Sequence, residues 1–330
     1  MSEHQDESEQ AGALGPPRRR GWRMAAWVAR IAIAGAILAL IIRKCDMAAF
    51  QGAFARVRLG WFGLSLAAFM GYFVVWAIRY GALLKTYSVA SPFWWRLRAV
   101  LTANCATMAL PGGWSGDVVR YMGGRRRRMP ALPVFSVIVL EKVVTFWAWC
   151  VLPLLAAGFV WGDTMVRWSA ALFASMAAAG IACFAARTFI FAMLRRAMTA
   201  IRLAGLCEKL NRLNDALDHS RSKKRLWAIS VLQTFIFEIL ICLAAYLAGV
   251  SAGLAVHPAH YVFMIALVYF INTVPVTPGG IGVREGIIVG YLLHLGVARE
   301  IGLVYGILIL AMNMLAVLVG AIVFAARGIE

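Results

Sequence analysis

Acidic residues are scarce in this sequence, and several common motifs are missing from it. Only 15 Asp and Glu residues stand against 33 Lys and Arg residues, so the formal net charge is +18. No Walker A motif is present, which argues against ATP hydrolysis by a P-loop. The six cysteines form no CxxC pair, which argues against a zinc site or a disulfide framework. We therefore expect no cofactor and no bound metal.

Apolar residues, by contrast, make up 62% of the chain. A soluble domain is usually about half apolar, so this composition predicts an all-α polytopic membrane protein. The polar stretches are too short to form a soluble nucleic-acid-binding domain, and we expect no nucleic-acid partner. The excess of Lys and Arg instead indicates cytoplasmic loops that contact anionic lipids of the inner leaflet.

Six apolar stretches are long enough to cross about 30 Å of hydrocarbon as helices. These predicted spans are residues 24–42, 61–80, 132–158, 166–194, 226–250 and 301–326. Residues 1–23 are polar and end in a basic cluster, and we expect a disordered cytoplasmic tail there. Two further apolar segments, 98–121 and 260–297, are interrupted by proline and glycine.

The two interrupted segments predict re-entrant hairpins. Proline removes a backbone donor and glycine is costly in a helix, so a lipid-facing helix has no use for them. Broken backbone at membrane depth survives only when it is buried in protein or lines a wet cavity. The residues of the first tip are Pro111, Gly112, Gly113 and Gly116, and those of the second are Pro278, Gly279, Gly280 and Gly282.

Charge sets the expected orientation. The positive-inside rule places the basic segments 125–128 and 195–225 in the cytoplasm and the uncharged loop 251–260 outside. Both termini are then cytoplasmic, and the two hairpins enter the membrane from opposite sides. Segment 195–225 also contains an amphipathic pattern, typical of either a helix on the inner membrane surface or a solvated connector.

The two halves of the chain are predicted to form an inverted repeat, residues 24–158 and 159–330. Pro111 matches Pro278 and Asn104 matches Asn272, at an offset of about 167 residues. Each half contains two spans, a hairpin and a further span, and the halves have opposite orientations. Inverted repeats with broken helices that meet at the midplane are typical of transporters.

Several ionisable residues fall in or beside apolar sequence: Asp117, Arg120, Glu141, Lys142, Glu238, Arg284 and Glu285. Each would cost about 3 kcal/mol if unpaired at bilayer depth, so these residues must pair or face water. Their signs nearly balance, which favours a polar cavity between the two halves.

Arg120 and Arg284 are the candidates for binding a lipid phosphate. Each follows a Pro-Gly-Gly, and a guanidinium donates two parallel hydrogen bonds to a phosphate. Asp117 and Glu285 would compensate their charges. The candidate substrate-binding set also includes Asn104, Asn272, Glu141 and Lys142. In the alternative interpretation, the arginines and carboxylates only hold the hairpins together. Glu238 is either a proton carrier or a hydrogen-bonded packing residue.

The motif PGGIGVREG at 278–286, with Asn272 before it and PGGWSGDVVR at 111–120, resembles a known family. It is similar to the flippase-like transmembrane region of the lysylphosphatidylglycerol synthase type, the membrane half of the multiple peptide resistance factor. The resemblance covers most of residues 24–326. It implies translocation of an anionic or polyprenyl-phosphate-type lipid across a bacterial or archaeal cytoplasmic membrane, here a bacterial inner membrane.

The chain departs from the family's pattern in two places. The family often has Glu-Arg after the first hairpin, where this chain has Glu141-Lys142, and an arginine in the last span, where this chain has Asn313. We expect no aminoacyl-transferase domain and no synthesis of lysyl-phosphatidylglycerol by this chain alone. Self-association into a homo-oligomer is left open.

Two other functions compete with lipid transport. The chain could be an accessory scaffold of a membrane glycosyltransferase or of another lipid-modification pathway. It could also be an intramembrane serine protease, because residues 113–116 fit a GxSG pattern around Ser115 and His294 lies in another apolar segment. The second alternative lacks the remaining protease motifs, so we expect the chain not to be an enzyme.

Overall fold

The computed structural model describes residues 45–109, 114–186, 224–273 and 277–327, with isolated positions between 32 and 43 and between 189 and 196. All elements in these ranges are helical. Within these ranges, five helices are long and apolar enough to cross a membrane. They are α4 (Leu59–Thr86), α7 (Ala131–Ala157), α8 (Thr164–Ala185), α11 (Lys224–Ser251) and α14 (Arg299–Arg327). The prediction of an all-α polytopic membrane protein is confirmed.

These helices coincide with five of the six predicted spans. The tail 1–23, most of the span 24–42, the tip residues Pro111, Gly112 and Gly113, and most of the segment 195–225 lie outside the described residues. A short helix, α3 (Met47–Ala55), precedes α4 and packs against α14.

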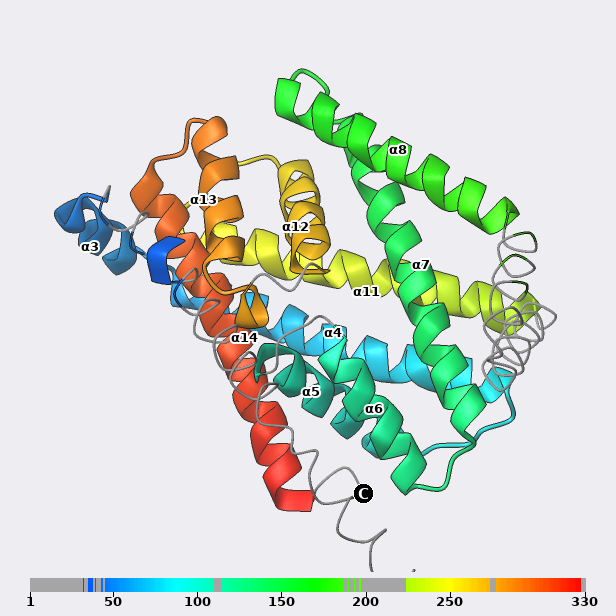
Figure 1. Cartoon of the computed structure of the whole chain (residues 1–330). Coiled ribbons are helices and arrows are strands. Elements are labelled where there is room, and N and C mark those ends of the chain that lie inside the picture. Colours follow the sequence, from blue (N-terminus) through cyan, green and yellow to red (C-terminus); the bar gives the residue numbers. More distant parts are fainter. Residues whose placement is uncertain are drawn as a thin grey trace, which may run out of the picture.

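The two interrupted segments form helical hairpins. The first consists of α5 (Phe93–Ala109) and α6 (Ser115–Arg126). The second consists of α12 (Pro258–Thr273), the short 3-10 turn η1 (Pro278–Gly280) and α13 (Val283–His294). At 1.5 Å per residue, each arm is about 18–26 Å long, which is less than the hydrocarbon thickness of about 30 Å. The order of long helix, hairpin and long helix thus occurs twice along the chain (Figure 1).

One end of the molecule holds the loop 251–260, which is predicted to lie outside, together with the start of α4 and the loop between α7 and α8. Helices α4 and α11 run antiparallel along each other (Figure 1), and the backbone N–H of Arg58 donates to the carbonyl of Ser251 at 3.0 Å. At the same end, the His294 ring contacts the Asp163 carboxylate at 2.9 Å. The hairpin α12–α13 therefore begins and ends on this side.

The other hairpin begins and ends on the opposite side. Trp95 near the start of α5 stacks on Tyr80 near the end of α4, with ring centroids 6.2 Å apart. The guanidinium of Arg127, just after α6, lies 5.7 Å from the Trp95 ring. The two hairpins therefore enter from opposite ends, as the sequence predicts. Which end faces the cytoplasm stays a prediction.

The tips of the two hairpins touch each other. A Cβ atom on Gly279 would lie 3.0 Å from the sulfur and 3.2 Å from the carbonyl oxygen of Met108, near the end of α5. Gly279 and Gly280 both have positive φ, 59° and 71°, which side chains other than glycine rarely adopt. A Cβ on Gly280 would lie 2.2 Å from the Asn272 amide oxygen. The predicted need for glycine at this tip is explained by both the backbone and the contacts.

Helix α5 also packs closely on the last long helix. A Cβ on Gly320 of α14 would lie 2.6 Å from the carbonyl oxygen of Leu101. On the other face of α5, a Cβ on Gly116 of α6 would lie 2.5 Å from the carbonyl oxygen of Ala103. Small residues of this kind let helix backbones approach in a membrane protein. The first hairpin is thus held by an element from the far end of the chain.

Candidate functional site

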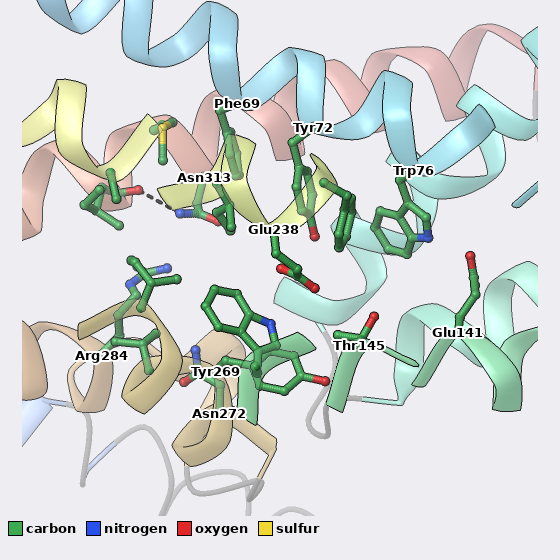
Figure 2. Close-up of a pocket in the computed structure, with 18 of the residues that line it drawn as sticks. Phe69, Tyr72, Trp76, Glu141, Thr145, Glu238, Tyr269, Asn272, Arg284 and Asn313 are labelled. Carbon is green, nitrogen blue, oxygen red and sulfur yellow. Dashed lines mark hydrogen bonds between the residues drawn. The ribbon is translucent and has the colours of Figure 1, made fainter. Parts of the chain in front are cut away.

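A cavity of about 240 Å³ lies among the long helices and the two hairpins, lined by residues of α4, α6, α7, α11, α12, α13 and α14. Its charged lining residues are Arg79, Arg120, Lys142, Arg284, Glu141 and Glu238. Its aromatic lining residues are Phe69, Tyr72, Trp76, Trp149, Phe237 and Tyr269. Figure 2 shows Arg284 on one side of this space, Glu141 on the opposite side and Glu238 between them.

Arg120 is held on several sides by protein groups. Its Nη2 atom donates to Asp117 Oδ1 at 2.5 Å, and its Nη1 atom donates to the Glu141 carboxylate. The guanidinium carbon lies 4.9 Å from the centre of the Trp76 ring and 5.2 Å from that of Tyr80. Both ends of the fork are occupied, so this arginine has the geometry of a strut between α6 and α7.

Lys142 completes the same network. Its ammonium lies 2.8 Å from Asp117 Oδ2, and 34% of its side-chain surface is exposed. Glu141 and Lys142 are neighbours on α7, yet both reach residues of α6. Two cations and two carboxylates thus cancel, which matches the expected balance of charge.

Arg284 differs from Arg120 in which donor is unused: the Nε atom of Arg120 is buried without a partner among the described residues, whereas for Arg284 it is an Nη atom. Its Nε and Nη2 atoms donate to Glu285 Oε1 at 2.9 and 2.7 Å. The other carboxylate oxygen of Glu285 accepts from the backbone N–H of Gly282 at 2.6 Å, capping the start of α13. The Nη1 atom of Arg284 has no hydrogen bond to any described residue, and the residue lines the cavity. Within the part of the chain that the structure describes, this nitrogen has no partner, and it is the donor available to a ligand in the cavity.

The two predicted asparagines are placed differently. Asn272 lines the cavity, and its amide oxygen has no hydrogen-bond partner among the described residues. Asn104 does not line it, and its amide nitrogen also lacks a partner within the described ranges. The side chain of Pro278 is outside the description, although its backbone belongs to η1.

Arg79 is a cavity residue that the sequence reasoning missed. It is fully buried, and its Nη2 atom donates to the backbone carbonyl of Glu141 at 2.8 Å. Its Nη1 atom lies 3.2 Å from the hydroxyl of Thr145. The sequence offered one signal, the position of Arg79 inside the predicted span 61–80. That signal was weak, because an arginine next to Tyr80 near the end of a span is also typical of the membrane surface.

The charges do not follow the repeat that the Pro-Gly-Gly motifs suggest. Arg284 is the second residue of α13, at the positive end of the helix dipole, whereas Arg120 is in the middle of α6. Both arginines line one cavity, but each is bound to carboxylates of the protein. The cavity is therefore chemically asymmetric, with its open guanidinium on α13.

Ser115 and His294, the residues considered for a protease, contact other groups. The Ser115 hydroxyl donates to the Ala106 carbonyl at 3.1 Å, within the first hairpin. His294 is at the end of α13, where its Nε2 atom contacts Asp163. The serine contact thus lies within the first hairpin and the histidine contact at the base of the second hairpin, beside the loop between α7 and α8.

The fold and this cavity define a polytopic helical membrane protein with a charge-lined chamber between two opposed hairpins. The family model for the lysylphosphatidylglycerol synthase TM region matches residues 27–320, and the chain belongs to this family. A UPF0104 membrane protein of Methanothermobacter thermautotrophicus is 20% identical over 251 residues, which cover 69% of this chain and 72% of that protein. The resemblance drawn from the two hairpin motifs is confirmed.

Proposed function

We propose that this protein moves a membrane lipid with a phosphate-containing headgroup from one leaflet of the bilayer to the other. The observation that carries the proposal is Arg284, which lines the cavity and whose Nη1 atom has no partner among the residues that the structure describes. It stands in the first turn of α13, where the helix dipole and the guanidinium act on the same anion. Arg284 is the principal phosphate contact in this proposal, and Arg120 maintains the shape of the site.

The size and lining of the cavity suit a headgroup. Its volume of about 240 Å³ is equivalent to about eight water molecules at about 30 Å³ each, enough for a phosphodiester with small substituents. Acyl or prenyl chains do not fit in that space and would stay in the bilayer. Four cations and two carboxylates are among the described residues that line the cavity, and Asp117 and Glu285 bind three of those cations. The favourable field for an anion is therefore local, at the start of α13 beside Arg284.

The two hairpins supply a route for alternating access. They enter from opposite ends and meet at Gly279 and Met108, so movement of either tip would open the cavity toward one end. We place the chain in a bacterial cytoplasmic membrane, with anionic inner-leaflet lipids at its basic loops. In this proposal the two halves form an inverted repeat that rocks around the fixed site.

Reconstitution of the purified chain tests the proposal. In liposomes that contain phosphatidylglycerol with a nitrobenzoxadiazole label on one acyl chain, we expect label in the inner leaflet to become accessible to dithionite only when the protein is present. Arg284→Ala should slow this about 10- to 100-fold, because a charge-assisted hydrogen bond contributes about 1.5–3 kcal/mol. Arg284→Lys keeps the charge but loses the paired hydrogen bonds of the guanidinium, so transport by this variant should be slowed less. Arg56→Ala, an exposed arginine before α4, is the matched control and should transport normally.

The outcomes separate the competing functions. If a well-folded Arg284→Ala variant transports at the rate of the unchanged protein, the phosphate site is elsewhere. If the unchanged protein moves none of a panel of phosphate-bearing lipids, including polyprenyl phosphates, the result favours the alternative function as an accessory scaffold. A protease would lose all activity on Ser115→Ala, whereas a lipid transporter would lose little.

A further inference from the structure

Glu238 is a cavity carboxylate that the proposed transport step does not use. It lies in the middle of α11 and is only 2% exposed. Its side chain makes no hydrogen bond or ion pair with any residue in the described ranges, and its Oε1 atom is buried without a partner. The interpretation of Glu238 as a hydrogen-bonded packing residue therefore lacks the bond that it requires.

The other cavity carboxylate, Glu141, is in a different state. It accepts from Arg120 through one oxygen, and its backbone carbonyl accepts from Arg79. Adding a proton to this carboxylate would break its ion pair with Arg120. Of the two carboxylates that line the cavity, Glu238 is the one whose proton can come and go without breaking an ion pair of the protein.

The surroundings of Glu238 are cationic and aromatic. The charged or titratable groups that share the cavity with it or act on it are Arg79 and Tyr72 on α4, Arg120 on α6, Glu141 and Lys142 on α7, Tyr269 on α12, Arg284 on α13, and Cys242 on its own helix. Helix α14 also packs on α11, and its described lining residues, Ile309, Met312 and Asn313, are not titratable. Arg79 donates only to the Glu141 backbone and to Thr145, so within the described residues no carboxylate is bonded to it. Glu141 and Glu238 are both near Arg79, and of these two Glu238 is the one that is not bonded to another arginine among the described residues.

We propose that Glu238 is a proton-binding site that couples the transport of an anionic lipid headgroup to a proton gradient. This inference rests on the proposed function. The chemical step is the addition of one proton from water to the Glu238 carboxylate, which gives the neutral acid, and the loss of that proton on the other side of the membrane. No other bond changes.

The coupling follows from charge. With Glu238 ionised, its charge offsets that of Arg79, and it repels a phosphate held near Arg284. With Glu238 protonated, the cavity gains one unit of positive charge, and the phosphate binds more tightly. Coupling between two bound species is reciprocal, so the bound lipid also favours the proton. The loaded cavity thus carries a proton and an anion together.

The test is lipid transport in the same proteoliposomes with and without a pH gradient. A gradient of about one pH unit is a difference of about tenfold in proton activity. We expect it to increase lipid movement from the acidic to the alkaline side several-fold. Glu238→Gln, which resembles the neutral acid, should transport at one rate whether or not the gradient is present. Glu300→Gln, at the start of α14 outside the cavity, is the matched control and should respond as the unchanged protein does.

A second measurement covers the case in which Glu238→Gln does not fold. At equal pH on both sides, lipid exchange by the unchanged protein should rise as the pH falls, and Glu238→Asp should shift that profile along the pH axis. If the unchanged protein moves lipid at one rate in all gradients and at all pH values, the inference is wrong and the proposed function stands. A gradient response that survives in Glu238→Gln also overturns it. If no lipid moves at all, the proposed function is wrong, and the inference that rests on it is wrong as well.

Discussion

Replacing Arg120 by alanine should destabilise the protein strongly, because it breaks a buried network. Asp117 and Glu141 are 7% and 3% exposed, and both bind this guanidinium. Removing one partner of a buried ion pair costs about 3–5 kcal/mol, since the other charge is left uncompensated. The variant also loses the contacts of the guanidinium with the rings of Trp76 and Tyr80.

Thermal unfolding in detergent, followed by tryptophan fluorescence, measures this cost. At about 2 °C per kcal/mol for a chain of more than 200 residues, Arg120→Ala should lower the unfolding temperature by about 6–10 °C. Lys142→Ala removes a partly exposed partner of Asp117 and should cost about 0–1 kcal/mol, or about 2 °C at most. Arg120→Met combined with Glu141→Gln should recover part of the loss, because position 141 is then neutral and Asp117 keeps Lys142 as its partner. Unfolding of Arg120→Ala within about 2 °C of the unchanged protein would refute the strut interpretation.

Three further changes test other parts of the structure. Gly280→Ala places a Cβ against the Asn272 oxygen at positive φ, so both the unfolding temperature and lipid transport should fall; unchanged values would contradict the tip geometry. Burial alone would raise the pKa of Asp163, but its hydrogen bonds to the His294 ring and to backbone N–H groups hold that pKa below its usual value of about 3.9. The stability from this pair is present above that value and lost as the pH falls through the lower folded pKa, so Asp163→Asn should lose less stability between about pH 5 and about pH 3. A cysteine at Arg127 should react with an impermeant maleimide in inside-out vesicles and not in intact cells, and the reverse would overturn the predicted orientation.

Much of the fold could be predicted from the sequence because membrane helices obey a simple length rule. An apolar run of about 20 residues has few alternatives to a spanning helix, and Pro-Gly-Gly in such a run marks a break. The boundaries of α4, α7, α11 and α14 accordingly match the predicted spans within a few residues. The first hairpin begins earlier than predicted, at Phe93, because Arg96 and Arg98 interrupt the apolar pattern without ending the helix.

The candidate site was harder to predict because it depends on which side chains meet. Arg120 and Arg284 follow similar motifs, and the sequence gives no sign that two carboxylates occupy the first and only one binds the second. Arg79 was missed because an arginine near the end of a span is ordinary until its burial is known. Pairing partners across helices are set by tertiary packing, which a single sequence does not contain.

The close contact between α14 and α5 also has a consequence for the order of assembly. A Cβ on Gly320 would lie 2.6 Å from the Leu101 carbonyl, so the final helix supplies one wall of the groove that holds the first hairpin. Synthesis begins at the N-terminus, and membrane helices insert before they associate. The first hairpin is therefore made early but reaches its final neighbours only after α14 leaves the ribosome. Until then its polar groups need other hydrogen-bonding partners, either water at the membrane surface or the insertion machinery.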